Sequence, residues 1–298
     1  MRKILVLGGT KFFGKRLVQK LLKNGDEVTV ATRGETPHPF GEQVHHLTVD
    51  RFDRGSMERT FQDGEWDVIY DQICFSPDDA VDACEIFAGR VERYVFTSTL
   101  SVYEFNGNAE KIEKDFDPYN YEVKLGRKEQ FDYGEGKRLA EAVFFQKAPF
   151  SVVAPRPPVV FGLDDYTERL HYHVRKVLNE EKIGLDHPEA RVSFVDSEDL
   201  AEFLFWTGFQ QFTGPVNASS PDQISLEKMI HLIEQASGKK ANVTAAHSKE
   251  ESSPINFPVS IFQDVSAAEA NGYHFRNLSD WFEQLIKDIV AEETRKSI

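Results

Sequence analysis

Tyr133 and Lys137 form a Tyr-x-x-x-Lys pair in a segment predicted to be helical over residues 133–146. A spacing of four places both side chains on one helix face. A phenol is a poor base near neutral pH because its pKa lies well above neutrality. A neighbouring ammonium stabilises the phenolate and lowers that pKa. The pair could therefore give or take the proton of a substrate hydroxyl, which is general acid–base chemistry.

Two glycines, Gly134 and Gly136, stand between the members of this pair. Each costs about 1 kcal/mol relative to alanine inside a helix. A local preference broken twice suggests that some group approaches the helix backbone closely there. The same spacing also occurs by chance on surface helices, so a catalytic role for the pair depends on the other motifs around it.

A glycine-rich turn follows the first apolar run, which covers residues 4–7 and is typical of a strand buried on both faces. Glycine allows a sharp turn, lets backbone N–H groups approach a pyrophosphate, and precedes a helix N-terminus that favours negative charge. The turn therefore predicts a dinucleotide site; the alternative is a tight turn with no ligand. The predicted cofactor contacts in the turn are Gly8, Thr10, Lys11, Phe12, Phe13 and Gly14.

The choice of dinucleotide depends on the end of the second predicted strand, residues 28–31. An acid there binds the ribose hydroxyls of NAD, whereas an arginine accommodates the 2′-phosphate of NADP. The strand is followed by Arg33, with no acid at that place. Arg33 favours NADP over NAD, unless it is simply an exposed loop arginine.

The elements that position these residues alternate between strand and helix. Further strands are predicted at residues 44–49, 68–70, 94–96 and 150–154, a helix at 78–88, and a loop with one short helix at 104–130. Strands alternating with helices imply a parallel sheet. The expected fold is α/β: a doubly wound parallel (Rossmann) sheet at residues 1–160, with a smaller C-terminal α+β substrate lobe at 161–298. Some segments of the lobe are expected to return to the sheet, and helices are predicted at 226–236 and 281–291.

The glycine turn, the strand at 94–96 and the Tyr-x-x-x-Lys helix together resemble the extended and atypical short-chain dehydrogenase/reductases, the NAD-dependent epimerase/dehydratase family. The turn matches at Gly8, Phe12, Phe13 and Gly14 and departs at Lys11, which stands where the family has a glycine. A lysine there could instead reach a phosphate.

The resemblance implies roles for four further positions. Asp50, at the end of the third strand, would contact the adenine edge. Thr99 would hydrogen-bond the substrate oxygen, with Ser101 nearby on the substrate side. Lys137 would also hold the nicotinamide ribose. Each hydroxyl could otherwise be an ordinary turn hydroxyl.

The substrate side departs from the nucleotide-sugar members of the family. By register, Val159 stands where they have an asparagine, and Val192 where they have an arginine. Arg169 could replace that anion contact, or could be a surface helix arginine. His171 and His173 have no third ligand near them in sequence, so no metal is expected.

Composition bounds the partners. The 298 residues carry 49 acidic and 35 basic side chains, a formal net charge of −14, and no strong basic run, so nucleic acid is not an expected partner. No apolar run approaches a membrane span, the apolar run at the start is too short for a signal peptide, and two cysteines make no disulfide framework. A cytoplasmic location is expected.

Two functions of different kinds remain. The first is an NADP- or NAD-dependent oxidoreductase or epimerase/dehydratase that acts on a small hydroxy, keto or sugar-type substrate by tyrosine-assisted hydride transfer. The second is a non-catalytic dinucleotide-binding sensor or an RNA-binding atypical relative. A homodimer packed through the Tyr-x-x-x-Lys helix is possible, since Phe144 and Phe145 lie on it, although core packing explains both residues equally well.

Overall fold

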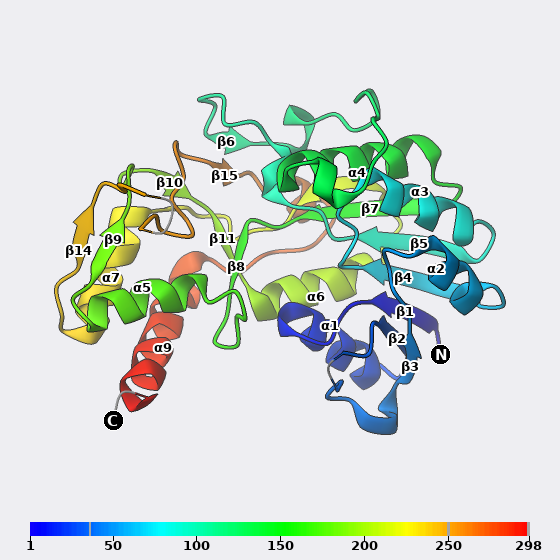
Figure 1. Ribbon diagram of the computed structural model, residues 1–298, viewed down its shortest axis with the longest axis horizontal. Coiled ribbons are helices and arrows are strands. Elements are labelled where there is room, and N and C mark those ends of the chain that lie inside the picture. The colour runs from blue at the N-terminus through cyan, green and yellow to red at the C-terminus, as the bar shows by residue number, and fades with distance from the viewer. Residues whose placement is uncertain (36, 249–250, 297–298) are drawn as a thin grey trace.

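The computed structural model describes residues 1–35, 37–248 and 251–296. Its centre is a seven-stranded sheet in the order β12-β7-β5-β4-β1-β2-β3, with every neighbouring pair parallel (Figure 1). The strands are β1 (Lys3–Leu7), β2 (Glu27–Thr32), β3 (His45–Thr48), β4 (Trp66–Asp71), β5 (Val91–Phe96), β7 (Ser151–Arg156) and β12 (Gly214–Asn217). The α/β doubly wound class is confirmed.

Helices cover both faces of this sheet, which explains why its inner strands are continuous apolar runs. One face carries α1 (Phe12–Lys23) and α6 (Ser197–Thr207). The other carries α2 (Arg54–Phe61), α3 (Pro77–Ile86) and α4 (Tyr133–Lys147) (Figure 1). In β1, the residues from Ile4 to Leu7 have no exposed surface.

The strand order reverses between β1 and β4. The chain runs from β1 outward to β2 and β3, then returns to β4 and continues through β5 and β7 on the other side. The helices that follow β1 and β4 lie on opposite faces of the sheet. A crevice therefore opens at the carboxyl ends of these two strands, where open α/β sheets bind ligands.

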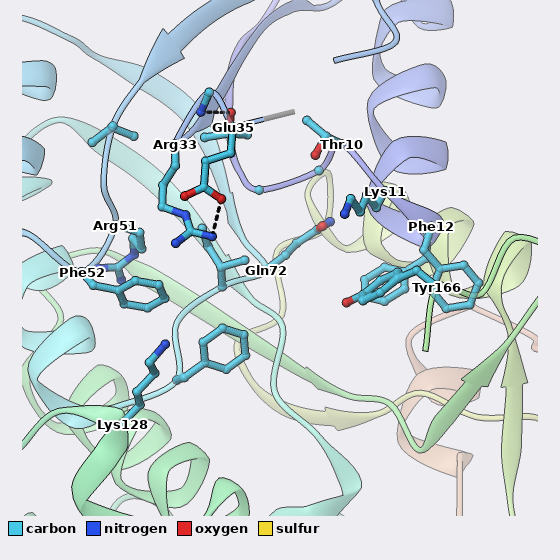
Figure 2. A pocket seen from close by; sticks show the side chains of 18 residues that line it. Thr10, Lys11, Phe12, Arg33, Glu35, Arg51, Phe52, Gln72, Lys128 and Tyr166 are labelled. Atoms are coloured by element: carbon cyan, nitrogen blue, oxygen red, sulfur yellow. Dashed lines mark hydrogen bonds and ion pairs between the residues drawn. The ribbon is translucent and has the colours of Figure 1, made fainter. Parts of the chain in front are cut away.

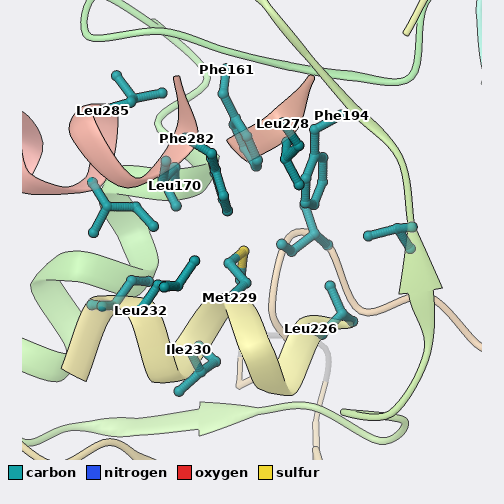
Figure 3. Close-up of a cluster of buried hydrophobic side chains, with 14 of the residues drawn as sticks. Phe161, Leu170, Phe194, Leu226, Met229, Ile230, Leu232, Leu278, Phe282 and Leu285 are labelled. Atoms are coloured by element: carbon teal, nitrogen blue, oxygen red, sulfur yellow. The ribbon is translucent and has the colours of Figure 1, made fainter. Parts of the chain in front are cut away.

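A smaller lobe at the other end of the molecule is built on its own apolar core (Figure 1). Its helices are α5 (Arg169–Leu178), α7 (Leu226–Ser237) and α9 (Phe282–Lys296), whereas α8 (Ser266–Ala270) packs against β12 of the large sheet. Figure 3 shows Leu226 and Met229 of α7 directed toward Phe161, Phe194 and Phe282. The core draws on residues from Leu100 to Val290, so the lobe is tied to the end of β5 as well as to its own helices.

Short strand pairs complete the lobe. They are β8 (Val159–Phe161) with β11 (Phe194–Asp196), β9 (Lys182–Gly184) with β14 (Asn242–Thr244), β10 (Arg191–Val192) with β13 (Ile224–Ser225), and β6 (Glu110–Lys111) with β15 (Phe262–Gln263). β12 joins the large sheet and α6 packs on α1, so segments beyond residue 160 do return to the first domain.

The stretch at 104–130 differs from the expected loop with one short helix. It contains β6 and two 3-10 turns, Glu113–Asp115 and Lys128–Gln130. β6 pairs with β15, far later in the chain, so no local pattern could reveal it. The remaining 3-10 turns are Gly41–Gln43, Leu100–Val102 and Leu278–Asp280. None of the helices in the described residues has the length and apolarity to cross a membrane.

Candidate dinucleotide and catalytic site

The turn after β1 requires glycine at three places. Gly8 and Gly9 have φ values of +95° and +81°, in the region that disfavours side chains. A Cβ on Gly9 would lie 2.6 Å from Cγ1 of Val6. A Cβ on Gly14 would lie 2.9 Å from the Cα of Gly9 and 2.2 Å from the Gln72 amide oxygen. The glycines thus hold the turn tightly against the first turn of α1.

The N-terminus of α1 is open to an anion. Lys11, its N-cap, is extended and makes no side-chain capping bond to any described residue. The first N–H groups of a helix have no acceptor within it, and the helix dipole favours negative charge at that end. Phe12 opens the helix with a left-handed φ of +51°, and its buried ring packs edge-on against Phe13 and Tyr166. Strained backbone of this kind is characteristic of functional sites.

A pocket of about 460 Å³ opens beside this turn, in the crevice between β1 and β4 (Figure 2). Its size is in the range of small-molecule sites. Figure 2 shows Arg33 and Lys128 extending toward the pocket from opposite sides. The lining comprises Gly8, Gly9, Thr10, Lys11, Phe12, Phe13, Thr32, Arg33, Gly34, Glu35, Val49, Arg51, Phe52, Gln72, Ile73, Phe75, Lys128 and Tyr166.

Six of the predicted cofactor residues line this pocket as described, namely Gly8, Thr10, Lys11, Phe12, Phe13 and Arg33, and Gly14 and Asp50 do not. The described lining of the pocket includes Val49, Arg51 and Phe52, which are neighbours of Asp50 in the sequence, but not Asp50 itself. The Asp50 carboxylate instead accepts a bond from the backbone N–H of Phe52, at 3.0 Å. A short acidic side chain readily closes a turn on its own backbone in this way. The adenine contact of Asp50 stays a prediction.

Arg33 lines the pocket, but it does so with an acidic partner. Its Nη2 lies 3.0 Å from Oε2 of Glu35, and the two side chains are 56% and 64% exposed. An ion pair this exposed contributes about 0–1 kcal/mol, so a ligand can rearrange it at little cost. Sequence reasoning found no acid at the strand end and missed Glu35, which the turn folds back into the pocket. An acid two residues past the arginine was the available signal.

The floor of the pocket rests on a buried ion pair. Arg51 donates to Oδ2 of Asp71 at 2.8 Å, and the Tyr94 hydroxyl donates to the same oxygen at 2.7 Å. Arg51 and Asp71 are 1% and 0% exposed. Although burial alone would lower the pKa of Arg51, the Asp71 carboxylate raises it well above its ordinary value. No sequence pattern indicated this pair, because its members lie in separate elements.

The two glycines in α4 allow backbone carbonyls from two other segments of the chain to approach the helix closely. A Cβ on Gly134 would lie 2.7 Å from the carbonyl oxygen of Ser101, and one on Gly136 would lie 2.5 Å from that of Phe75. The close approach predicted from sequence is therefore present, and it docks α4 on the segments that follow β5 and β4. This docking brings Tyr133 and Lys137 to the carboxyl end of the sheet.

Lys137 is enclosed at that end. Its Nζ donates to the carbonyls of Cys74 at 2.7 Å and Thr97 at 2.8 Å. The ammonium also lies 4.9 Å from the ring centroid of Phe75 and 4.7 Å from that of Phe96. The side chain is 2% exposed. Two carbonyls and two aromatic faces satisfy the buried charge.

Tyr133 and Thr99 lie beyond the pocket rather than in it. Tyr133 is 54% exposed, and its ring centroid is 6.4 Å from that of Phe75. Thr99 is buried, and its Oγ1 accepts the N–H of Ser101 at 3.1 Å, which starts a 3-10 turn. In the part of the chain that the structure describes, neither residue contributes to the pocket wall, and nor does Lys137. Their catalytic roles stay predictions.

A second buried ion pair supports this end of the site. Arg156 Nε donates to Oε1 of Glu141 at 3.0 Å, and both side chains are fully buried. Ser98 donates to the same carboxylate, and Arg156 donates to the Tyr103 hydroxyl at 3.0 Å. The Tyr103 hydroxyl in turn donates to Asn217 at 2.6 Å. The network joins the segment after β5 to α4, β7 and β12, and so fixes the segment that carries Thr99.

The candidate substrate residue Arg169 lies elsewhere. It is the first residue of α5, in the smaller lobe, and is absent from the described lining of the pocket. Its carbonyl lies 2.7 Å from Nδ1 of His173, whose Nε2 lies 2.7 Å from the Ser253 hydroxyl. Burial lowers the pKa of His173 to about 4. Within the described residues, no group of three or more His, Cys, Asp and Glu side chains is arranged to hold a metal.

The two phenylalanines considered for a dimer interface have partners within the chain. Phe144 is 1% exposed and packs on Tyr94 and Phe96. The Phe145 ring lies 5.1 Å from that of Tyr119. Packing inside the chain accounts for both, and the homodimer stays a prediction.

Comparison with known proteins agrees with this geometry. The family model of the NAD dependent epimerase/dehydratase family matches residues 4–210. The chain belongs to this family. The resemblance inferred from the glycine turn and the Tyr-x-x-x-Lys helix is thereby confirmed.

One curated relative matches over a limited region. It is the chloroplast stem-loop binding protein of 41 kDa b of Arabidopsis thaliana, 30% identical over 115 residues. The match covers 34% of this chain and 30% of the relative, so less than a third of that protein's length is represented.

Solved structures match over nearly the whole chain. UDP-glucose 4-epimerase of Thermus thermophilus, in complex with NAD, has a TM-score of 0.70 and 19% identity, covering 99% of this chain and 100% of that one. WbmG of Bordetella bronchiseptica, in complex with NAD and UDP, has a TM-score of 0.73 and 17% identity, covering 99% of this chain and 96% of that one. UDP-N-acetylglucosamine 4-epimerase of Methanobrevibacter ruminantium M1 has a TM-score of 0.76 and 16% identity, covering 99% of each chain. At these identities the likeness shows the fold.

Proposed function

We propose that this protein is an NAD(P)-dependent oxidoreductase or epimerase/dehydratase that acts on a hydroxyl-bearing or carbonyl-bearing carbon of a small or sugar-type substrate. The observation that carries the proposal is the placement of α4. Its Tyr133 and Lys137 lie where β4 and β5 end, and Lys137 bonds to the segments following both strands. The dinucleotide pocket ends beside them, at Phe75.

The pocket fits a dinucleotide on several grounds. The uncapped N-terminus of α1 and the close-packed glycines offer backbone N–H groups to a pyrophosphate. Nε2 of Gln72 is buried in the wall and lacks a partner among the described residues. A buried amide without a partner is costly, and a phosphate oxygen would satisfy it. Lys11, Arg33 and Lys128 add positive charge around the pocket.

The residues near α4 would divide the chemistry. When bound, the nicotinamide supplies or accepts the hydride. Tyr133 would give or take the proton at the substrate oxygen, and the Lys137 ammonium would favour its phenolate form. The Thr99 hydroxyl would donate a hydrogen bond to that oxygen, with its neighbour Ser101 lining the substrate side.

The cofactor choice turns on two neighbouring side chains. Arg33 can meet a 2′-phosphate, which supports NADP, whereas the Glu35 carboxylate can accept bonds from a ribose diol, which supports NAD. Several of the similar structures are complexes with NAD. A consumed reductant and an internally recycled cofactor are both compatible with the site.

A thermal-shift series with NAD, NADH, NADP and NADPH tests the proposal. A ligand at one hundred times its dissociation constant stabilises the fold by about 2.7 kcal/mol, enough to raise the melting temperature visibly. A larger shift with NADP or NADPH supports the Arg33 prediction and a reductase. A shift confined to NAD or NADH supports epimerase or dehydratase chemistry. If none of the four shifts a preparation freed of bound nucleotide, the dinucleotide proposal is wrong.

RNA binding is a second candidate, because the Arabidopsis relative is a stem-loop binding protein. The net charge of −14 opposes it, since phosphate contacts need basic side chains. A gel shift with structured RNA at physiological salt decides the matter. Micromolar binding that persists with competitor would establish this candidate, and its absence would exclude it.

A further inference from the structure

We propose that the side chain of Phe75 determines whether a whole dinucleotide, or only its adenosine diphosphate half, can occupy the site. The inference rests on the proposed function, because it takes the pocket to be a nucleotide site. Phe75 follows the end of β4 and lines the pocket, and its carbonyl oxygen lies against Gly136 of α4. Beyond it lie Tyr133 and Lys137.

The ring of Phe75 contacts residues on both sides of this boundary. Its centroid is 6.3 Å from that of Phe52, which lines the pocket, and the two rings are inclined by 28°. On the other side, its centroid is 6.4 Å from the Tyr133 ring and 4.9 Å from Nζ of Lys137. One side chain therefore separates the nucleotide pocket from both members of the acid–base pair.

The backbone at Phe75 is held from both sides. Its N–H donates to Oδ2 of Asp79 at 3.2 Å. Its carbonyl oxygen lies against Gly136, so closely that a Cβ there would approach within 2.5 Å. The next residue, Ser76, caps the N-terminus of α3. Because the main chain is held at these points, rotation of the Phe75 side chain is the smallest movement that opens the site here.

The position of the Phe75 ring restricts access to Lys137. Its ammonium is surrounded by the carbonyls of Cys74 and Thr97 and by the rings of Phe96 and Phe75. Phe96 belongs to β5 and is fully buried, so it has no space to move. Phe75 is only partly buried. With 2% exposure, Lys137 can meet a ribose hydroxyl only after the Phe75 ring turns away.

Binding of NAD and of ADP, measured by calorimetry on the full chain, tests the proposal. ADP lacks the nicotinamide riboside and needs only the pocket. If molecules with the Phe75 ring turned away make up about one tenth of the population, Phe75→Ala raises the affinity for NAD about tenfold relative to ADP. Phe52→Ala is the matched control: it removes the facing ring on the nucleotide side and should change both affinities by the same factor. Equal changes for NAD and ADP in Phe75→Ala would overturn the proposal.

Chemical labelling of Lys137 gives a readout that needs neither cofactor nor substrate. Acetic anhydride followed by mass spectrometry should leave Lys137 unmodified in the wild type and modify it in Phe75→Ala. Saturating NAD should then protect it again. If Lys137 stays unreactive in the variant, the proposal that the Phe75 ring encloses it is wrong. Phe75→Leu, which keeps an apolar side chain without the flat ring, serves if the alanine variant does not fold. If wild-type protein binds neither ADP nor NAD, the proposed function fails, while the labelling still tests the enclosure.

Discussion

The two ends of the candidate site differ in how their cationic side chains are exposed to solvent. The nucleotide end, the pocket around Gly8–Gly14, Arg33 and Phe52, is open, and Arg33 is 56% exposed there. The predicted catalytic end, comprising Thr99, Tyr133 and Lys137, holds its lysine at 2% exposure behind Phe75, although Tyr133 is 54% exposed. Backbone N–H groups and an exposed cation bind a phosphate even at an accessible surface, whereas a buried cation is tolerated only when the protein satisfies its charge. Arg33 can therefore rearrange around a ligand, whereas Lys137 is held in place by the protein.

Each end rests on one buried ion pair. Arg51 with Asp71 supports the nucleotide end, and Arg156 with Glu141 supports the catalytic end. Burial of charge is tolerated only when partners satisfy it. Perturbing one end at a time should therefore separate nucleotide binding from turnover.

The largest effect is expected at Tyr133. Tyr133→Phe removes the proton donor and should lower turnover about 10²–10⁴-fold, with ADP and NAD affinity nearly unchanged. Turnover is to be measured on whichever substrate a screen identifies. Tyr119→Phe is the matched control, because Tyr119 is 51% exposed, close to the 54% of Tyr133. Undiminished turnover in Tyr133→Phe would remove Tyr133 from the mechanism.

Arg156→Met should destabilise the fold strongly. It leaves the Glu141 carboxylate, which has no exposed surface, without its cation. Breaking a buried ion pair in this way costs about 3–5 kcal/mol. Urea denaturation measures the loss, and the double variant Glu141→Leu with Arg156→Met should recover much of it. A loss as large in the double variant would mean that packing, rather than the unpaired charge, is responsible.

Gly136→Ala should weaken the docking of α4. The added Cβ would lie 2.5 Å from the carbonyl oxygen of Phe75, which is held in place. Overpacking at a fixed contact costs about 1–3 kcal/mol. Thermal unfolding measures the loss. In Gly55→Ala of α2, the new Cβ meets only the movable ends of the Arg59 and Asp53 side chains, so this control should be neutral or stabilising. Equal melting temperatures would show that α4 can shift freely.

The smallest effect on stability is expected at the exposed pair of Arg33 and Glu35. Removing either charge should change the free energy of unfolding by less than about 1 kcal/mol. The cofactor preference should change instead: Arg33→Ala should weaken NADP relative to NAD, and Glu35→Ala should do the reverse. Competition binding with the two cofactors measures the ratio. A ratio unaltered by both variants would place the ribose elsewhere in the pocket.

Local patterns in the sequence were sufficient for six of the seven strands of the large sheet and for the main motifs. The apolar run of residues 4–7, the glycine turn and the helix containing Tyr133 and Lys137 all lie where the pattern predicts, because each depends on neighbours within a few residues. Gly134 and Gly136 even indicated a close backbone contact. They could not indicate which segment makes it, since Ser101 and Phe75 are far away along the chain.

Only the tertiary structure decided how these motifs meet. The ion pair between Arg51 and Asp71 and the enclosure of Lys137 behind Phe75 depend on how distant parts of the chain fold together. Periodicity and turn chemistry act over a few residues, so the sequence by itself determined the alternating fold and its two motifs. Burial and charge pairing act between distant segments, and they set the exposed Arg33 at one end of the site against the enclosed Lys137 at the other.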